Sequence, residues 1–481
     1  MIQTSLRRLL GLTFFRDFPI NPALSEGLPL SIQAQSAALF RAFAGPITGS
    51  PLERATALLA MLTGFSIPLS TSFSEIATGL FVVAWLLSGN FATKWRTICG
   101  NNVALLSLAL FGLLALGMTW SSEGPLTSGR CLLKFRELVY LPMFIAVFQE
   151  PRLRRLGSFA FIAGACVLLG MSYFEWLTGF DYGISSFEDY IIGKDRIVHS
   201  IIMALLAYLA ALEIFTKSAG SIVARSAWLR RGMWIVVVAL AAGNVIFMLH
   251  GRTGYLSLAV LTVLFLFERM GRRGVAVACL GLAATAWGAL SLSSSIHVRV
   301  DQTLLQIRSQ FGPERKHAPD PRLEFYENTL KLISRHPLIG TGTGSFQTQY
   351  SKLIEGTDDR PTADPHNEYL NLASQVGIPG GLLFFVLLAV QWFAAGRLAA
   401  PDQQIGRSVV LTVALGSLFN SLILSVTGGL IYAYFSGLAF AALSQRRGTA
   451  AGEGPEAPDV GPAPAVEMAL GAGDHELRRA A

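Results

Sequence analysis

Residues 232–267 read GMWIVVVALAAGNVIFMLHGRTGYLSLAVLTVLFLF, and the run is apolar on both sides of a polar break at His250, Gly251 and Arg252. Each half is close to the ~20 residues that cross a bilayer core of about 30 Å. Only helices and closed barrels satisfy their backbone in lipid, and these runs are too long for barrel strands. The stretch therefore predicts two membrane helices that meet at the break.

The composition extends this prediction to the whole chain. Of 481 residues, 52% are hydrophobic and only 14% are charged, whereas about a quarter of the residues in a soluble domain are charged. Similar apolar runs recur, so we expect an all-α, polytopic integral membrane protein with about twelve transmembrane helices. The expected spans are 52–69, 73–89, 102–119, 132–148, 156–175, 198–215, 232–249, 253–267, 275–294, 377–395, 408–425 and 428–444.

The distribution of Lys and Arg predicts the orientation, because these residues are enriched in cytoplasmic loops. With the N-terminus inside, the inner loops carry fourteen of them and the short outer loops only four, Arg130, Lys194, Arg196 and Arg252. Both termini are therefore expected in the cytoplasm, and no cleaved signal peptide is expected. The predicted parts are an N-terminal segment (1–50), nine spans (51–294), a large, partly helical outer loop (295–376), three spans (377–445) and a disordered tail (446–481).

The net charge of +7 follows from this loop bias and does not indicate a nucleic-acid partner. Cys99, Cys131, Cys166 and Cys279 are scattered, which favours buried thiols over a metal site or a disulfide framework. No Asp-x-Asp metal motif occurs. We expect neither a metal nor another cofactor.

Histidines gather on the predicted outer side. Six of the seven lie there, which indicates proton handling or anion contact, because imidazole exchanges protons near neutrality. The alternative is that outer loops are simply where polar residues accumulate. The six are His199, His250, His297, His317, His336 and His366.

Arg252 interrupts two apolar helices with no acidic neighbour in the sequence, so it must reach water, a partner or a ligand. Gly251 and Gly254 allow the backbone to unwind, and free amides beside a guanidinium suit a phosphate. The alternative is an interfacial arginine that reaches lipid headgroups.

The outer loop contains PRLEFYENTLKLISRHPLIGTGTGSF from residue 321, in which apolar residues at helical spacing predict a helix that ends at Pro337. Arg322 falls in its first turn, where a cation is poorly placed for the helix dipole and so favours an external role over a solvated charge. GTGTGSF (340–346) lacks the lysine of a phosphate loop. Its glycines indicate a tight turn beside a ligand or another helix.

Residues 360–381 read RPTADPHNEYLNLASQVGIPGG. We expect Asp364 to cap a helix, Pro365 to start it and His366 to lie in its first turn. The positive end of the helix would keep His366 neutral and able to accept a proton. Asn367 would orient it or bind a sugar hydroxyl. The alternative is a histidine that bonds a neighbouring loop.

Further cationic groups border this outer side. They are candidate contacts for phosphate or acceptor, although charges beside a membrane often only anchor a helix. The candidates are Lys134 and Arg136 in CLLKFRELVYLP, the edge formed by Lys194, Arg196 and His199, and His250 beside Arg252.

Together these motifs resemble the O-antigen ligase and polymerase superfamily of bacterial envelopes. The resemblance rests on Arg-Thr-Gly at a helix break, a long outer loop, P-L-I-G-x-G-x-G-x-F, and P-H-N-E-Y-L followed by G-I-P-G. It covers residues 250–395 in detail. It implies a GT-C-like fold and essential roles for Arg252, Arg322 and His366. The match of Arg322 rests on its position in the loop.

The resemblance implies glycan transfer at the periplasmic face of the inner membrane. The donor would be undecaprenyl-pyrophosphate-linked glycan, and a ligase would transfer it to a sugar hydroxyl of lipid A-core oligosaccharide. Arginines would stabilise the departing diphosphate, and His366 would deprotonate or orient the acceptor hydroxyl. Attack from the opposite face predicts inversion.

Other functions stay open at this point. A polymerase of the same superfamily often has two sizeable outer loops, whereas residues 176–197 form a short second loop. A protein oligosaccharyltransferase would commonly carry a longer outer C-terminal region. A secondary transporter is less favoured, because the polar residues gather in one loop and no repeat of two halves is visible.

Overall fold

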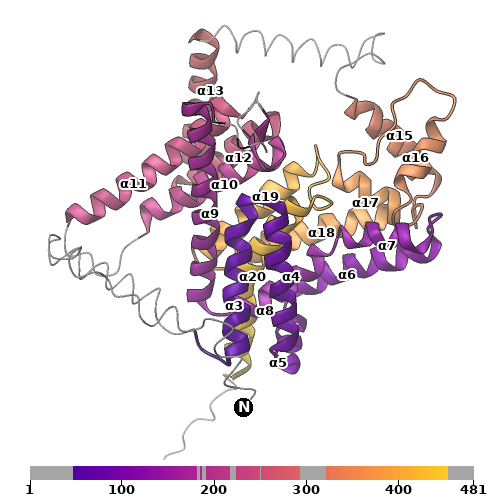
Figure 1. The fold of residues 1–481 in the computed structure, drawn as a ribbon, viewed down its shortest axis with the longest axis horizontal. Coiled ribbons are helices and arrows are strands. Elements are labelled where there is room, and N and C mark those ends of the chain that lie inside the picture. The colour runs from indigo at the N-terminus through magenta and orange to yellow at the C-terminus, as the bar shows by residue number, and fades with distance from the viewer. Residues whose placement is uncertain are drawn as a thin grey trace, which may run out of the picture.

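The computed structural model describes residues 47–180, 182, 185–186, 191–216, 224–249, 251–292 and 321–452 (Figure 1). Within these residues the fold is helical, apart from one antiparallel pair of two-residue strands, β1 (Ser185–Ser186) and β2 (Ile191–Ile192). The predicted all-α class is confirmed for this part of the chain.

Polar side chains at the helix starts set several boundaries in the first half of the chain. Ser50 and Glu53 form a capping box at the first described helix, and Asn101 accepts two amide protons at the start of another. The helices up to the strands are α3 (Pro51–Leu69), α4 (Thr71–Leu87), α5 (Phe91–Cys99), α6 (Asn102–Gly117), η2 (Met118–Trp120), α7 (Pro125–Leu133), α8 (Glu137–Val147) and α9 (Pro151–Thr178).

The second half continues with helices, one of which ends in a π-helical turn before the predicted polar break. These elements are α10 (Arg196–Phe215), α11 (Ala224–Gly243), η3 (Asn244–Met248), α12 (Arg252–Met270), α13 (Arg272–Leu292), α15 (Arg322–Arg335), α16 (Phe346–Ile354), α17 (Glu368–Val376), α18 (Ile378–Ala395), α19 (Asp402–Gly416) and α20 (Val426–Gly452). The predicted disordered tail thus begins with helix, and residues 1–46 and 453–481 lie outside the described part.

Seven helices of the described chain are long and apolar enough to cross a membrane, or eight if α4 and α5, bent by 112°, form one span. These numbers are compatible with a multi-pass membrane protein. The seven fall on predicted spans, and the other five predicted spans overlap α3, α4, α8, α13 and α19. The predicted span 408–425 is wrong at its end, because α19 stops at Gly416 and residues 417–425 form a turn. The count of twelve stays a prediction.

The predicted span 132–148 is wrong at its start. α7 ends at Leu133, and α8 begins only at Glu137 and has 11 residues. At 1.5 Å per residue it rises about 16 Å, half of a bilayer core. The charged residues Lys134 and Arg136 occupy the turn between the two helices.

The centre of the bundle is aromatic and lies around α20, and 83% of the most apolar stretch of this helix is buried inside the protein. Phe81 and Phe144 stack with ring centroids 4.6 Å apart, and Tyr434 packs edge-on against Phe144. A Cβ at Gly64 would lie 2.1 Å from the Tyr434 hydroxyl oxygen, so glycine is needed there. This packing joins α3, α4, α8 and α20, which lie together in Figure 1.

Polar contacts join loops that the charge bias places on the same side. On the predicted outer side, Lys194 Nζ donates to the hydroxyls of Thr71 and Thr427 at 3.1 and 3.2 Å, which connects three loops. On the predicted inner side, Arg154 Nε donates to Asp402 at 3.1 Å. This is the arrangement that a bundle with alternating loops requires.

The large loop between α13 and α18 has a small core of its own. It is built from α15 and α16, and its helices lie beside α6 and α7 at one edge of the bundle in Figure 1. The buried residues of this core are Phe325, Leu332, Phe346, Tyr350 and Ile354. The predicted helix from Arg322 to the residues before Pro337 is confirmed as α15.

Candidate functional site

His366 lies in a turn immediately before α17 and has a left-handed backbone, with φ of +52°. Its side chain is 37% exposed. Nδ1 lies 3.7 Å from Oδ1 of Asp364, too far for a hydrogen bond but close enough for electrostatic attraction. The other nitrogen, Nε2, has no hydrogen-bond partner among the described residues. It is therefore the nitrogen available to a substrate.

The predicted start of this helix is wrong. Asp364 does not cap it; Asn367 does, by accepting the N–H of Leu370 at 3.1 Å, and the helix begins at Glu368. Asp364 Oδ1 instead accepts the N–H of His366 at 2.7 Å. This is an Asx-turn, in which an Asp side chain accepts from the backbone N–H two residues later. His366 therefore lies before the helix and not in its first turn, so the predicted effect of the helix on its protonation has no basis in this fold.

Asn367 is engaged in the fold at both ends of its amide. In addition to capping the helix, it donates from Nδ2 to the carbonyl of Leu418 at 3.1 Å, and it is buried. The structure therefore gives this side chain a role in holding the loop.

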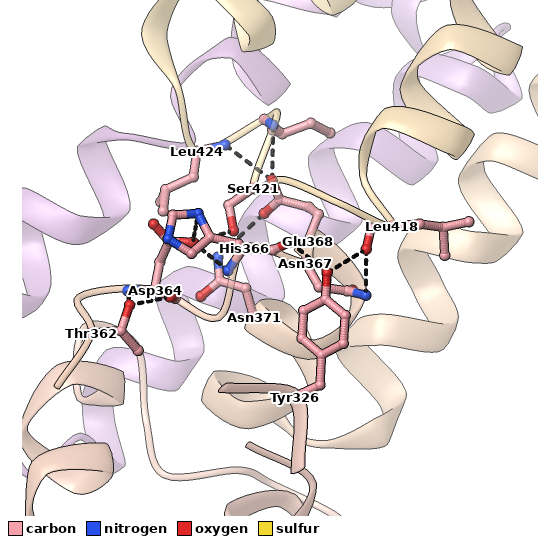
Figure 2. A network of polar contacts seen from close by, with 11 residues as sticks. Tyr326, Thr362, Asp364, His366, Asn367, Glu368, Asn371, Leu418, Ser421 and Leu424 are labelled. Carbon is pink, nitrogen blue, oxygen red and sulfur yellow. Dashed lines mark hydrogen bonds and ion pairs between the residues drawn. The ribbon is translucent and has the colours of Figure 1, made fainter. Parts of the chain in front are cut away.

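α15 packs its first turns against the histidine. The ring of Phe325 stacks on the imidazole with centroids 5.9 Å apart. The Tyr326 hydroxyl lies 3.3 Å from the carbonyl of His366 and 3.0 Å from that of Leu418 (Figure 2). Arg322 starts the same helix, one turn before these contacts. The structure therefore packs the helix that carries Arg322 against His366, and the role of Arg322 in a site stays a prediction.

The glycine loop serves the packing of helices. The amides of Thr341 and Gly342 donate to carbonyls in the last turn of α17 at 2.9 and 2.8 Å, and that of Thr343 donates to Gly117 at the end of α6 at 3.1 Å. Gly342 has φ of +95°, and a Cβ there would lie 2.2 Å from Cα of Ser121. These amides are occupied, so the loop is not a phosphate cradle, and the prediction of a tight turn beside a helix is confirmed.

Glu368 is a site residue that the sequence analysis missed. Its carboxylate is fully buried and accepts the backbone N–H groups of Ile423 and Leu424 at 2.8 and 3.1 Å (Figure 2). Burial raises its pKa to about 7, although these amides lower it. A Glu directly after an N-cap Asn normally indicates only a favourable helix dipole, so no local signal marks this residue.

Arg252 and Arg196 start neighbouring helices. The predicted break is confirmed: α11 ends in η3, and Arg252 begins α12 after Gly251. A Cβ at Gly251 would lie 3.3 Å from Cγ of Arg196, and one at Gly254 would lie 2.5 Å from Cβ of Ser200. The two glycines thus let α12 approach α10 closely, which brings the starts of both helices together. His250 lies outside the described residues.

The predicted cationic edge divides into exposed and buried members. Arg196 is exposed, but His199 is 0% exposed, and neither of its ring nitrogens has a partner within the described residues. Lys194 is largely buried, and burial lowers its pKa to about 8 while Asp195 opposes the shift. The structure thus places His199 inside the bundle, behind Lys194.

Lys134 and Arg136 differ in the same way. Lys134 is exposed at the end of α7. The guanidinium of Arg136 forms an ion pair with Glu75 and has Glu137 at 3.7 Å. Arg136 already holds a carboxylate, which leaves Lys134 as the more accessible of these two cations.

The described residues contain no group of three or more His, Cys, Asp and Glu side chains that could hold a metal ion. Metal independence stays a prediction.

Comparison with known protein families identifies this arrangement. Residues 235–385 match a family model described as O-antigen ligase. The match covers 151 of the 481 residues and supports a member of the O-antigen ligase and polymerase family. A comparison with curated proteins gave no match.

The matched range begins in α11 and ends in α18, so it contains Arg252, Arg322 and His366. Lys194 and residues 417–424 lie outside the matched range. The family consists of ligases and polymerases of the glycosyltransferase kind that act on lipid-linked polysaccharides in membranes. The match supports, in general terms, a glycosyl-transfer role.

Proposed function

We propose that the chain is an O-antigen ligase. It would transfer a polysaccharide from undecaprenyl pyrophosphate to a sugar hydroxyl of lipid A-core oligosaccharide, at the periplasmic face of the bacterial inner membrane. The observation that carries the proposal is the packing of α15, which begins at Arg322, against His366 within the matched family domain. That packing supports a site in which a cation and a base act on one substrate.

The proposed chemistry follows from the groups present. The acceptor hydroxyl donates its proton to Nε2 of His366 while its oxygen attacks the anomeric carbon. The bond from that carbon to the diphosphate oxygen breaks, and the leaving diphosphate takes the electron pair. Asp364, 3.7 Å from Nδ1, favours the imidazolium that forms. Attack opposite the leaving group inverts the anomeric configuration.

Arg252 and Arg322 are proposed to hold the diphosphate, because guanidinium groups bind phosphate in a bidentate manner and stay charged. Arg196, which starts the helix beside Arg252, is a further contact of the same kind. Lys134 is the proposed exposed contact for the acceptor core. Negative charge develops on the leaving diphosphate as its bond to the anomeric carbon breaks. Cations that are already in place stabilise this charge without a reorganisation of the site.

A polymerase of the same family, or a protein oligosaccharyltransferase, would use the same donor and differ in the acceptor. The family match is common to ligases and polymerases. The decisive experiment supplies the purified, reconstituted protein with a lipid-pyrophosphate glycan and one of three acceptors. These are lipid A-core oligosaccharide, a second carrier-linked glycan and a hydroxyl-bearing protein.

We expect transfer to lipid A-core oligosaccharide, and we expect a chelator to leave the turnover unchanged. Transfer to carrier-linked glycan alone would replace the ligase by a polymerase, and transfer to protein alone by an oligosaccharyltransferase. Loss of turnover with chelator, restored by a divalent ion, would contradict metal independence.

A further inference from the structure

A line of buried amide side chains runs along one face of α17 and ends at Glu368. Gln375, Asn371 and Glu368 are at most 2% exposed. Gln375 Nε2 donates to Oδ1 of Asn371 at 2.9 Å, and Asn371 Nδ2 donates to Oε1 of Glu368 at 3.3 Å. The spacing of three and four residues places the three side chains on one helix face.

Backbone donors fix the direction of this network at both ends. At one end the N–H of Gly344 donates to Oε1 of Gln375 at 2.8 Å. At the other end the amides of Ile423 and Leu424 donate to Oε2 of Glu368. Backbone amides cannot be turned round to accept. Every donor in the line therefore points toward Glu368, where the two directions meet.

Such a meeting point needs a side chain that only accepts hydrogen bonds. An ionised carboxylate has this property, whereas a carboxamide or a protonated carboxyl must donate on one side. A donor at position 368 would face either the amide group of Asn371 or the backbone amides. Inverting the whole line would only move the conflict to Gly344. A buried donor facing a donor is costly.

The segment held by this carboxylate is residues 417–424, the turn between α19 and α20. The same turn also meets the histidine loop at three other points and α15 at one, and Figure 2 shows those of Leu418 and Ser421. The N–H of Glu368 donates to Ser417 O at 2.9 Å, and Ser421 Oγ donates to Oδ1 of Asp364 at 2.9 Å. Leu418 O receives both the Asn367 amide and the Tyr326 hydroxyl.

We propose that Glu368 is a positioning residue for glycan transfer, which ties the 417–424 turn to the loop of His366 by acting as the common acceptor of the buried network. The turn leads into α20, whose Thr427 accepts from Lys194. The carboxylate thus connects the imidazole loop with the cationic side of the site. This inference rests on the proposed function for its activity readout.

The test moves the acceptor by one helical turn. Glu368→Gln places a donor at the meeting point, and we expect kcat to fall about 10- to 100-fold through misplacement of the imidazole. Asn371→Asp alone sets two carboxylates against each other and should also lower kcat. The double variant Glu368→Gln with Asn371→Asp restores an acceptor for every donor: Oδ atoms at position 371 accept from both neighbours. It should recover most of the activity.

Hydrogen exchange of the amides of Ile423 and Leu424 gives a readout that does not need turnover. Exchange should quicken in Glu368→Gln and slow again in the double variant. Glu355→Gln, at an exposed glutamate after α16, is the matched control and should change neither quantity. A loss caused by general unfolding would not be rescued by a second substitution.

Full transfer activity in Glu368→Gln, or a double variant no better than either single variant, would overturn the inference. If the unchanged protein transfers no glycan while the exchange data follow the expected pattern, the proposed function fails and the network stands. The two failures are therefore distinct.

Discussion

His366 combines an exposed imidazole with an unusual backbone. Among the described residues, Asn90 and His366 are the non-glycine residues with positive φ, a conformation that is uncommon outside glycine and clusters at functional sites. The Asp364 turn and the α15 contacts hold it there. The residue is therefore fixed by its surroundings, as a base that must meet one hydroxyl requires.

Arg252→Ala and Arg322→Ala are each expected to lower kcat about 100- to 1,000-fold, because each removes a fixed charge from the departing diphosphate. Arg335→Ala removes an exposed arginine from the other end of α15 and should keep the activity. Steady-state transfer kinetics check this. Equal activity of Arg252→Ala and Arg335→Ala would remove Arg252 from the site.

At the scale of elements, the glycine loop determines how α6, α7 and α17 meet. Gly342→Ala should lower the midpoint of thermal unfolding clearly, since its Cβ would lie 2.2 Å from a backbone atom. Gly356→Ala is the matched control: its φ is +77° but nothing lies within 4 Å of the added Cβ. It should cost only the backbone strain, roughly 1 kcal/mol. Equal midpoints in the two variants would contradict the packing role.

Glu368 on α17 leads us to expect that both stability and activity depend on pH. Burial raises the pKa of Glu368 from 4.5 to about 7. Between these values the folded chain holds a proton that the unfolded chain releases, so the contribution of this group to stability is full below pH 4.5 and is lost as the pH rises through 7. Activity should change in the opposite sense, because the acceptor-only carboxylate forms as the pH rises.

Rate and unfolding midpoint, measured from pH 5 to 9 in the unchanged protein and in Glu368→Gln, test this. The variant should lose the stability change near pH 7, because it lacks the carboxyl group at position 368. Asp364 on the loop, Cys131 on α7 and Tyr369 on α17 also interact electrostatically with Glu368. A stability change near pH 7 that persists in the variant would assign it to another group.

Local sequence patterns predicted the elements whose ends are set by local chemistry. Pro337 ends α15, and the polar break at Arg252 separates η3 from α12 as expected. The predicted start of α17 is three residues too early, because Asp364 accepts from His366 instead of capping the helix. The Glu368 carboxylate accepts from the amides of Ile423 and Leu424, which lie 55 and 56 residues further along the chain. No local pattern contains such a contact.

At the scale of the whole molecule, the proposed function requires the site to lie on the side of the membrane opposite the two termini. In a background with Cys99, Cys131, Cys166 and Cys279 replaced by serine, Glu355→Cys should react with a membrane-impermeant maleimide added to spheroplasts. Arg397→Cys, exposed on the predicted inner side, should react only after permeabilisation. The reverse pattern would invert the topology.

Glycan transfer by His366→Asn in the reconstituted system tests most directly whether His366 is the base. Asparagine tolerates the left-handed backbone, so this variant keeps the turn and removes the base. His336→Asn, at the exposed end of α15, is the control. We predict that transfer falls about 100- to 10,000-fold in His366→Asn and is unchanged in His336→Asn. Normal transfer by a correctly folded His366→Asn protein would contradict the role of His366 as the base.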